Sequence, residues 1–215
     1  MQYSLVKKDR VTTSKTELIL QILLIFILPV ALIKFGIIPI SMRIPVLVAV
    51  AALTLFVLIK EKWTLNMFHV DMQSVKKYYP QYILFTVVGV VMISVLGENL
   101  GKEEIARWWT YPHFLYLFFV VSLFQEILYR GYLIPALQKL LNETAVVILC
   151  NTIIFTFMHM LFQNPQVGLP LAFIGGIGFA TMYIRYPSLP LIVLSHAVLN
   201  FCALLYGFFL VHGGI

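Results

Sequence analysis

The chain has 215 residues and a net charge of +6, and 61% of its residues are hydrophobic while 11% are charged. Soluble domains are about half apolar and about a quarter charged, so this composition excludes a soluble domain. The charges lie between apolar runs of roughly 16 to 23 residues, a length that crosses a bilayer as a helix. We therefore expect an all-α, polytopic transmembrane bundle with about seven spans, in which residues 1–215 form one domain and the lipid bilayer is the solvent. The basic residues occupy short connecting segments and do not form one face with interleaved aromatics, so a nucleic-acid partner is not expected.

Seven apolar runs are predicted to cross the membrane. The first, from Leu18 to about Lys34, follows a basic N-terminal stretch and is longer than the core of a signal peptide. The other six are Ile44–Ile59, Tyr82–Gly97, His113–Leu133, Thr144–Phe162, Gly168–Tyr183 and Ser188–Leu210. Between the second and third runs, Lys60–Tyr79 mixes charged residues with Trp, Met and Phe side chains, which predicts an interfacial amphipathic helix. Pro29 and Pro190 are expected to bend or end their helices.

Basic residues in alternate connections predict the orientation of the chain, because cytoplasmic loops are enriched in Lys and Arg. The N-terminal stretch and the second, fourth and sixth connections together hold eleven Lys and Arg residues, and the opposite side holds four. This distribution predicts a protein of the cell membrane with a cytoplasmic N-terminus and an external C-terminus.

Small residues recur at every fourth position of the sixth run, at Ala172, Gly176 and Ala180. Such a stripe lets two helices approach closely in a bilayer. We interpret it as a packing face and not as a ligand site.

Charged residues inside the predicted spans are rare. A charge at the centre of a span costs about 2.5 to 3.5 kcal/mol on insertion scales, so it calls for a partner or a function. Glu126 and Arg130 lie four residues apart in the fourth run, which places them one helical turn apart and close enough to pair. The pair is explained either by the mutual neutralisation of two buried charges or by a functional site.

Two further runs each carry a histidine with a polar residue on the same helical face. In the fifth run Asn151, Phe155 and His159 follow one another in four-residue steps, and in the seventh run His196 and Asn200 do the same. A single buried histidine is usually a hydrogen-bonded core residue, and an asparagine in an apolar helix often joins two helices. Each pair alone is therefore compatible with packing.

Three separate runs thus contribute polar residues to an otherwise apolar bundle, and exposing all of them to lipid would be costly. We therefore expect Glu126, Arg130, His159, His196 and Asn200 to face a common polar cavity. A carboxylate, two imidazoles, a guanidinium and an amide supply a base for water, a proton donor for a leaving amine and donors for an oxyanion. The pattern favours the hydrolysis of an amide bond.

The three polar pairs also occur in the order of known motifs. The series Glu126 to Arg130, Phe155 to His159 and His196 to Asn200 resembles the EExxxR, FxxxH and HxxxN motifs of the CAAX-protease and bacteriocin-processing family, which includes the Ras-converting prenyl endopeptidases. The resemblance covers the motif-bearing core, about residues 114–201. It implies a glutamate-type intramembrane endopeptidase that cleaves a membrane-associated peptide or protein.

The resemblance also implies roles for the matching residues. Arg130 would hold the acidic end of the EExxxR motif in place, and His159 would help to orient or protonate the reacting groups. His196 with Asn200 would bind the oxyanion. Gln125 stands at the first acidic position of EExxxR, where the family has its usual catalytic base, and glutamine cannot act as a base. Either Glu126 activates water, which requires a rotated or distorted helix because adjacent helical residues differ by about 100° in direction, or the chain is an inactive relative that acts as a membrane binding or scaffold protein.

Two other chemistries use the same residue types. Glu126, His159 and His196 could ligate a divalent metal such as zinc, although no HExxH spacing accompanies them. A transporter could use buried Glu, Arg and His side chains for proton coupling, but no inverted repeat is evident. We therefore predict a peptide-bond hydrolase without a cofactor, and keep the metal site as the alternative.

Overall fold

The structure is a computed structural model that describes residues 13–60, 68–111, 114, 117–162 and 164–209. Within these residues every regular element is a helix, so the predicted all-α class is confirmed. The first helical path joins α1 (Lys15–Ile22), the π-helix η1 (Leu23–Ile27) and α2 (Leu28–Lys34). Ser14 caps it, because its hydroxyl accepts the backbone N–H of Glu17 at 3.2 Å. The path continues through Pro29, and the wide π turns of η1 lie directly before this proline.

A short 3-10 helix, η2 (Ile40–Met42), leads into α3 (Arg43–Lys60). The next helix, α4 (Met72–Asn99), begins after Asp71, whose carboxylate accepts the backbone N–H of Ser74 at 2.6 Å. The sequence predicts a separate interfacial helix at Lys60–Tyr79. In the structure residues 72–79 are instead the first turns of α4, because the Asp71 cap starts a helix that continues past Pro80; residues 61–67 lie outside the described part of the chain.

The fourth predicted span is neither a simple α-helix nor confined to His113–Leu133. After the 3-10 helix η4 (Trp108–Thr110), a continuous helical path consists of α5 (Phe118–Glu126), the π-helix η6 (Ile127–Leu133) and α6 (Ile134–Leu140). The polar residues of the fourth run therefore lie where an α-helix widens into a π-helix, a feature that is common at functional sites.

The C-terminal half contains α7 (Thr144–Met158), the 3-10 turn η7 (His159–Leu161), α8 (Pro165–Arg185) and α9 (Leu189–Leu205). Pro190 lies in the first turn of α9, where its missing N–H is not needed, so it starts this helix and does not bend it. The helix ends five residues before the predicted Leu210, because Gly207 adopts the left-handed conformation (φ 66°). The N–H groups of Gly207 and Phe208 then bond the carbonyls of Leu204 and Ala203, which turns the chain back toward the bundle.

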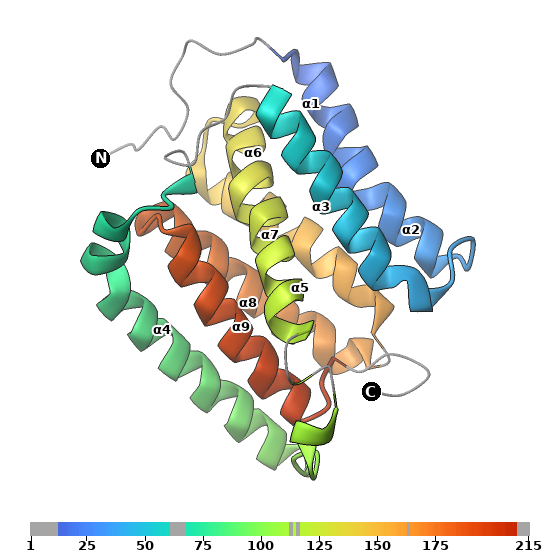
Figure 1. The fold of residues 1–215 in the computed structure, drawn as a ribbon, viewed down its shortest axis with the longest axis vertical. Helices are drawn as coiled ribbons and strands as arrows, with labels where there is room; N and C mark the ends of the chain where they lie inside the picture. Colours follow the sequence, from blue (N-terminus) through green and yellow to red (C-terminus); the bar gives the residue numbers. More distant parts are fainter. Residues whose placement is uncertain (1–12, 61–67, 112–113, 115–116, 163, 210–215) are drawn as a thin grey trace.

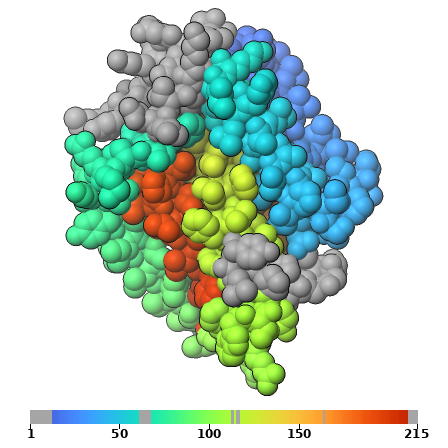
Figure 2. Space-filling view, in the orientation of Figure 1, coloured from blue at the N-terminus to red at the C-terminus, as the bar shows by residue number. Residues whose placement is uncertain are grey.

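The helix α9 is largely buried and packs against α4, α5 and α8. Figure 1 shows α4 at one edge of the bundle and α1 to α3 at the other, and Figure 2 shows α9 between α4 and α5 on this face. The predicted small-residue stripe of α8 is confirmed as a packing face, since Ala172, Gly176 and Ala180 are all buried. A Cβ at Gly176 would lie 3.1 Å from a methyl group of Thr152 in α7, so the two helices approach closely there.

The outer surface of the bundle is apolar. Large hydrophobic side chains are exposed on several helices, among them Leu24, Phe56, Leu84, Ile153 and Leu194. Within the described residues, five helices are long and apolar enough to cross a membrane: Lys15–Lys34, Ile40–Lys60, Met72–Asn99, Thr144–Leu161 and Pro165–Arg185. Lipid accommodates such an apolar surface, whereas water does not. The chain is therefore an integral membrane protein, and the number of seven spans stays a prediction.

Candidate active site

Glu126, Arg130 and His196 form one buried, hydrogen-bonded cluster. The Oε1 atom of Glu126 accepts a hydrogen bond from Nη1 of Arg130 at 3.0 Å and lies 2.5 Å from Nδ1 of His196. The side chains of Glu126 and Arg130 have no exposed surface, and that of His196 is 2% exposed. The predicted i, i+4 pairing of the carboxylate with the guanidinium is confirmed, and the histidine of α9 joins the same oxygen.

The π-helix η6 places Arg130 inside the bundle. The carbonyl of Tyr129 accepts two hydrogen bonds, one from the backbone N–H of Ile134 and one from Nδ2 of Asn151 in α7 at 2.9 Å. The guanidinium carbon of Arg130 lies 4.9 Å from the ring centre of Phe155 and 5.2 Å from that of Phe179. Aromatic faces stabilise a desolvated cation, so these two rings complete the surroundings of Arg130.

His159 is held by its own helix and by aromatic rings. The helix α7 tightens into η7 at this residue, and Nδ1 of His159 lies 3.0 Å from the carbonyl oxygen of Phe155, to which only a protonated nitrogen can donate. Its other nitrogen, Nε2, is therefore free of the backbone. The ring of Phe209 lies 5.1 Å away, because the turn at Gly207 returns the chain to this place.

Two cavities border these side chains, and mostly apolar residues line both. The first, of about 180 Å³, lies among α2, α3, α5 and η7, and the second, of about 120 Å³, lies among α4, α8 and α9. His159, Asn200 and Phe209 line both cavities, whereas His196 lines the second alone. Nδ2 of Asn200 donates to the hydroxyl of Ser122 at 2.9 Å, which fixes the amide at this boundary.

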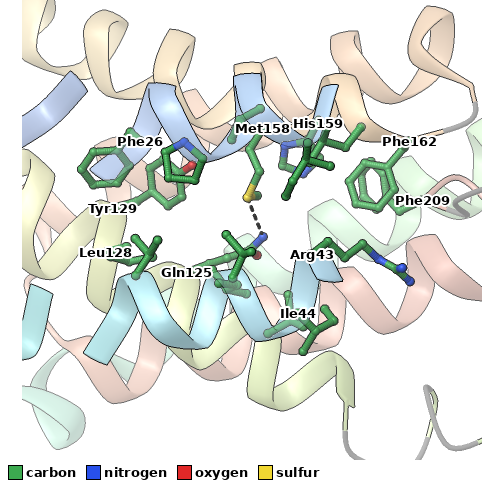
Figure 3. Close-up of a pocket in the computed structure, with 18 of the residues that line it drawn as sticks. Phe26, Arg43, Ile44, Gln125, Leu128, Tyr129, Met158, His159, Phe162 and Phe209 are labelled. Carbon is green, nitrogen blue, oxygen red and sulfur yellow. Dashed lines mark hydrogen bonds between the residues drawn. The ribbon is translucent and has the colours of Figure 1, made fainter. Parts of the chain in front are cut away.

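Gln125 and Glu126 have different surroundings although they are adjacent. Gln125 lines the first cavity, and its Nε2 donates to the sulfur of Met158 at 3.5 Å (Figure 3). Glu126 lines neither cavity and lies behind His196. The predicted common polar cavity is therefore not what these two cavities show. His159, His196, Asn200 and Gln125 border two mostly apolar cavities, whereas Glu126 and Arg130 line neither and form a buried layer, because they pair with each other.

The candidate metal ligands do not form a ligand set in the described residues. No group of three or more His, Cys, Asp and Glu side chains in this part of the chain could hold a metal ion. Oε1 of Glu126 is shared by Arg130 and His196, so Oε2, which has no partner, is the carboxylate oxygen left for a metal ion. Glu126, His159 and His196 are not grouped as three zinc ligands in the described residues, and the metal alternative stays a prediction.

Several residues at the site were missed in the sequence. Arg43 was used only to predict orientation, yet it lines the first cavity together with Met158. Phe209 was treated as part of a longer span, and Gly207 is the one signal that could have indicated a chain reversal before it. Ser122 gave no signal, because a serine in an apolar helix usually bonds its own backbone, as this one does with the carbonyl of Phe118 at 2.8 Å.

Comparison with protein families agrees with the motif pattern. The family model described as "Type II CAAX prenyl endopeptidase Rce1-like" matches residues 107–202, which include every candidate site residue and the buried cluster. A comparison with curated proteins and one with solved structures gave no match. The matched segment begins before α5 and ends near the end of α9, so it contains the polar faces of α5, α7 and α9. The match supports the assignment of this motif-bearing part of the chain to the CAAX protease family.

Proposed function

We propose that the protein is an intramembrane endopeptidase in which Glu126 acts through His196. The observation that carries this proposal is the hydrogen bond between Oε1 of Glu126 and Nδ1 of His196, on a histidine that borders the second cavity. The substrate would be a membrane-associated peptide or protein. Membership in a protease family supports hydrolysis of a peptide bond as the type of reaction.

The hydrogen bond defines which nitrogen of His196 is available. An ionised carboxylate only accepts, so the proton between the two groups belongs to Nδ1, and Nε2 keeps its lone pair. A carboxylate that holds an imidazole in this tautomer and stabilises its protonated form is the arrangement used in serine hydrolases. Arg130 pairs with the same carboxylate oxygen at 3.0 Å and supplies the buried cluster with a countercharge.

The proposed reaction uses His196, Asn200 and His159, which border the cavities. Nε2 of His196 removes a proton from water, and the resulting hydroxide adds to the carbonyl carbon of the peptide bond. The amide of Asn200 donates to the oxyanion that forms. The proton then held by His196 passes through Nε2 of His159 to the leaving nitrogen as the C–N bond breaks, so that an acid and an amine are produced and both imidazoles are neutral again. This assignment changes the expected role of Glu126 from direct water activation to orientation of His196, because Glu126 lines neither cavity. It also changes the expected role of His196 from oxyanion binding to proton acceptor, because its Nδ1 is bonded to Glu126.

A second candidate function is a non-catalytic relative that binds peptides in the membrane. The observation that favours it is the position of Gln125, which borders the first cavity at the place where the family motif has its first glutamate. Glutamine cannot accept a proton from water. In this alternative the cavities bind a peptide without cleaving it.

One set of cleavage assays distinguishes the two functions. The purified chain in detergent is incubated with apolar peptides and the products are identified by mass spectrometry. We expect cleavage by the parent and a loss of about 100- to 10,000-fold in His196→Gln, since this is the contribution of a general base. His69→Asn is the matched control, because His69 has a positive φ of 51°, which asparagine tolerates, and lines neither cavity.

The outcome for Gln125→Glu decides between the alternatives. If the parent cleaves nothing and Gln125→Glu is active, the non-catalytic function holds for the chain as it stands. If the parent cleaves and His196→Gln retains activity within tenfold, the role of His196 is refuted. If neither the parent nor Gln125→Glu cleaves any peptide, the endopeptidase proposal fails.

A further inference from the structure

The first cavity contains one permanently charged side chain among its described lining residues, Arg43 at the start of α3. Arg43 is partly buried, and no carboxylate in the described residues pairs with it. Its Nη1 atom makes a long hydrogen bond of 3.4 Å to the carbonyl of Ile40. A guanidinium carries five donors, so most of the hydrogen-bonding capacity of Arg43 is available to a ligand.

The same cavity contains a buried acceptor without a partner. Gln125 is 5% exposed, and its Oε1 atom has no hydrogen bond in the structure, although its Nε2 donates to Met158. A buried carbonyl oxygen without a donor costs about 1 to 3 kcal/mol. Gln125 therefore presents an acceptor that a bound N–H group would satisfy.

Arg43 and Gln125 lie at different places along the cavity. Figure 3 shows Arg43 on the side of Phe162 and Phe209, with its guanidinium directed away from Gln125. Apolar residues of α2 and α3, such as Val30 and Leu47, line the wall between α2, α3 and α5. A matching ligand has an N–H group, apolar side chains and an anionic end.

We propose that the first cavity binds an apolar peptide by two polar contacts: a peptide N–H donates to Oε1 of Gln125, and a carboxylate at the end of the peptide pairs with Arg43. Arginine binds carboxylates through two parallel hydrogen bonds, which suits this end group. The inference deepens the proposed function, because it assigns the residues that hold the ligand in the cavity. It also gives Gln125 a role as an acceptor that needs no basicity. Arg43 lies outside residues 107–202, so the family motifs do not include it.

A lipid headgroup is the other source of an anion near Arg43, since arginine side chains at helix ends often reach the membrane surface. The lining favours a peptide. An acyl chain in the cavity would leave Oε1 of Gln125 without a donor, whereas a peptide backbone supplies one.

The test measures binding and not cleavage. The parent is placed in phosphatidylcholine nanodiscs, and the affinities of a fluorescent apolar peptide with a free C-terminal carboxylate and of its C-terminal carboxamide are compared. We expect the carboxylate form to bind about 10- to 100-fold more tightly, as for a hydrogen-bonded charged group. Arg43→Gln should lower the affinity for the carboxylate peptide to that for the carboxamide peptide. The affinity for the carboxamide peptide should stay unchanged, which also shows that the variant is folded.

Two variants serve as comparisons. Lys34→Gln is the matched control, because Lys34 ends α2 and donates to the carbonyl of Met160 at 3.1 Å but does not line the cavity. It should leave both affinities within about twofold. Gln125→Met removes the acceptor at similar volume and should weaken both peptides about equally, by roughly tenfold.

Three results would overturn the inference. They are equal binding of both peptides by the parent, equal losses in Arg43→Gln and Lys34→Gln, and displacement of the peptide when phosphatidylglycerol is added to the nanodiscs, which would assign Arg43 to lipid headgroups. Binding without cleavage would refute the proposed endopeptidase and leave this inference intact. Cleavage of the carboxylate and carboxamide peptides with equal KM would refute this inference and leave the proposed endopeptidase intact.

Discussion

Replacing Glu126 by glutamine tests the buried cluster most directly. The substitution removes the negative charge and keeps an oxygen at a similar place. Both charged side chains have no exposed surface, and Oε1 of Glu126 serves Arg130 at 3.0 Å and His196 at 2.5 Å. Breaking a buried pair by removing one charge costs about 3 to 5 kcal/mol, because the other charge stays buried and unpaired. The remaining amide oxygen still accepts one hydrogen bond, so we expect a loss of about 3 kcal/mol in the free energy of unfolding.

The measurement is reversible unfolding in mixed micelles of the parent and the variant. The double variant Glu126→Gln/Arg130→Met separates the unpaired charge from a general loss of packing, since it removes both charges at similar volume. We expect it to be more stable than Glu126→Gln alone, because replacing both members of a buried pair is often neutral or stabilising. A loss below about 0.5 kcal/mol in Glu126→Gln, or a double variant less stable than the single one, would show that the pair is not the buried cluster described here.

Four further outcomes are expected. Gly131→Ala should lower stability by about 1 kcal/mol, because its Cβ would lie 2.9 Å from the Phe68 ring, and Phe68→Leu should restore the loss; no rescue would contradict this contact. Asn151→Leu should cost about 0.5 to 1.5 kcal/mol by removing one of the two donors to the Tyr129 carbonyl, and an unchanged stability would argue against that bond. Terminal reporter fusions should be active in the cytoplasm at the N-terminus and outside at the C-terminus, and the opposite pattern would reverse the orientation. A chelator should leave cleavage and thermal stability unchanged, and a loss restored by zinc would establish the metal alternative.

Much of the architecture could be predicted because membranes impose a simple rule on composition. Apolar runs long enough to span a bilayer indicate helices, and the first, second, third and sixth predicted spans lie within helices of the structure. The pairing of Glu126 with Arg130 could also be predicted, since a four-residue step depends only on helical geometry and survives the change from α to π turns. The packing stripe of α8 follows from the small size of Ala172, Gly176 and Ala180 in the same direct way.

The layering of the site could not be predicted from spacing. Helical periodicity predicts that the side chains of Gln125 and Glu126 leave the helix about 100° apart. Which of the two faces a cavity depends on how α5 packs against α3 and α9. The π-helix η6 has no sequence signature here, because one of the contacts that holds it comes from another helix, where Asn151 of α7 donates a second hydrogen bond to the Tyr129 carbonyl. The helix start at Asp71 was missed for a related reason: a single cap outweighed the mixed polarity of the residues that follow it.

The boundary shared by the two cavities has a consequence for inhibitor chemistry. Because His159, Asn200 and Phe209 line both spaces, a compound that fills one cavity alone touches only one side of these residues. A dumbbell-shaped compound, with an apolar group at each end and a narrow polar centre, would contact both sides at once. Val121 lines only the first cavity and Gly175 only the second. A substitution at Val121 would therefore change the affinity for groups on the first end of the compound, and a substitution at Gly175 the affinity for groups on the second end. Resistance substitutions at Phe209 would affect both ends together.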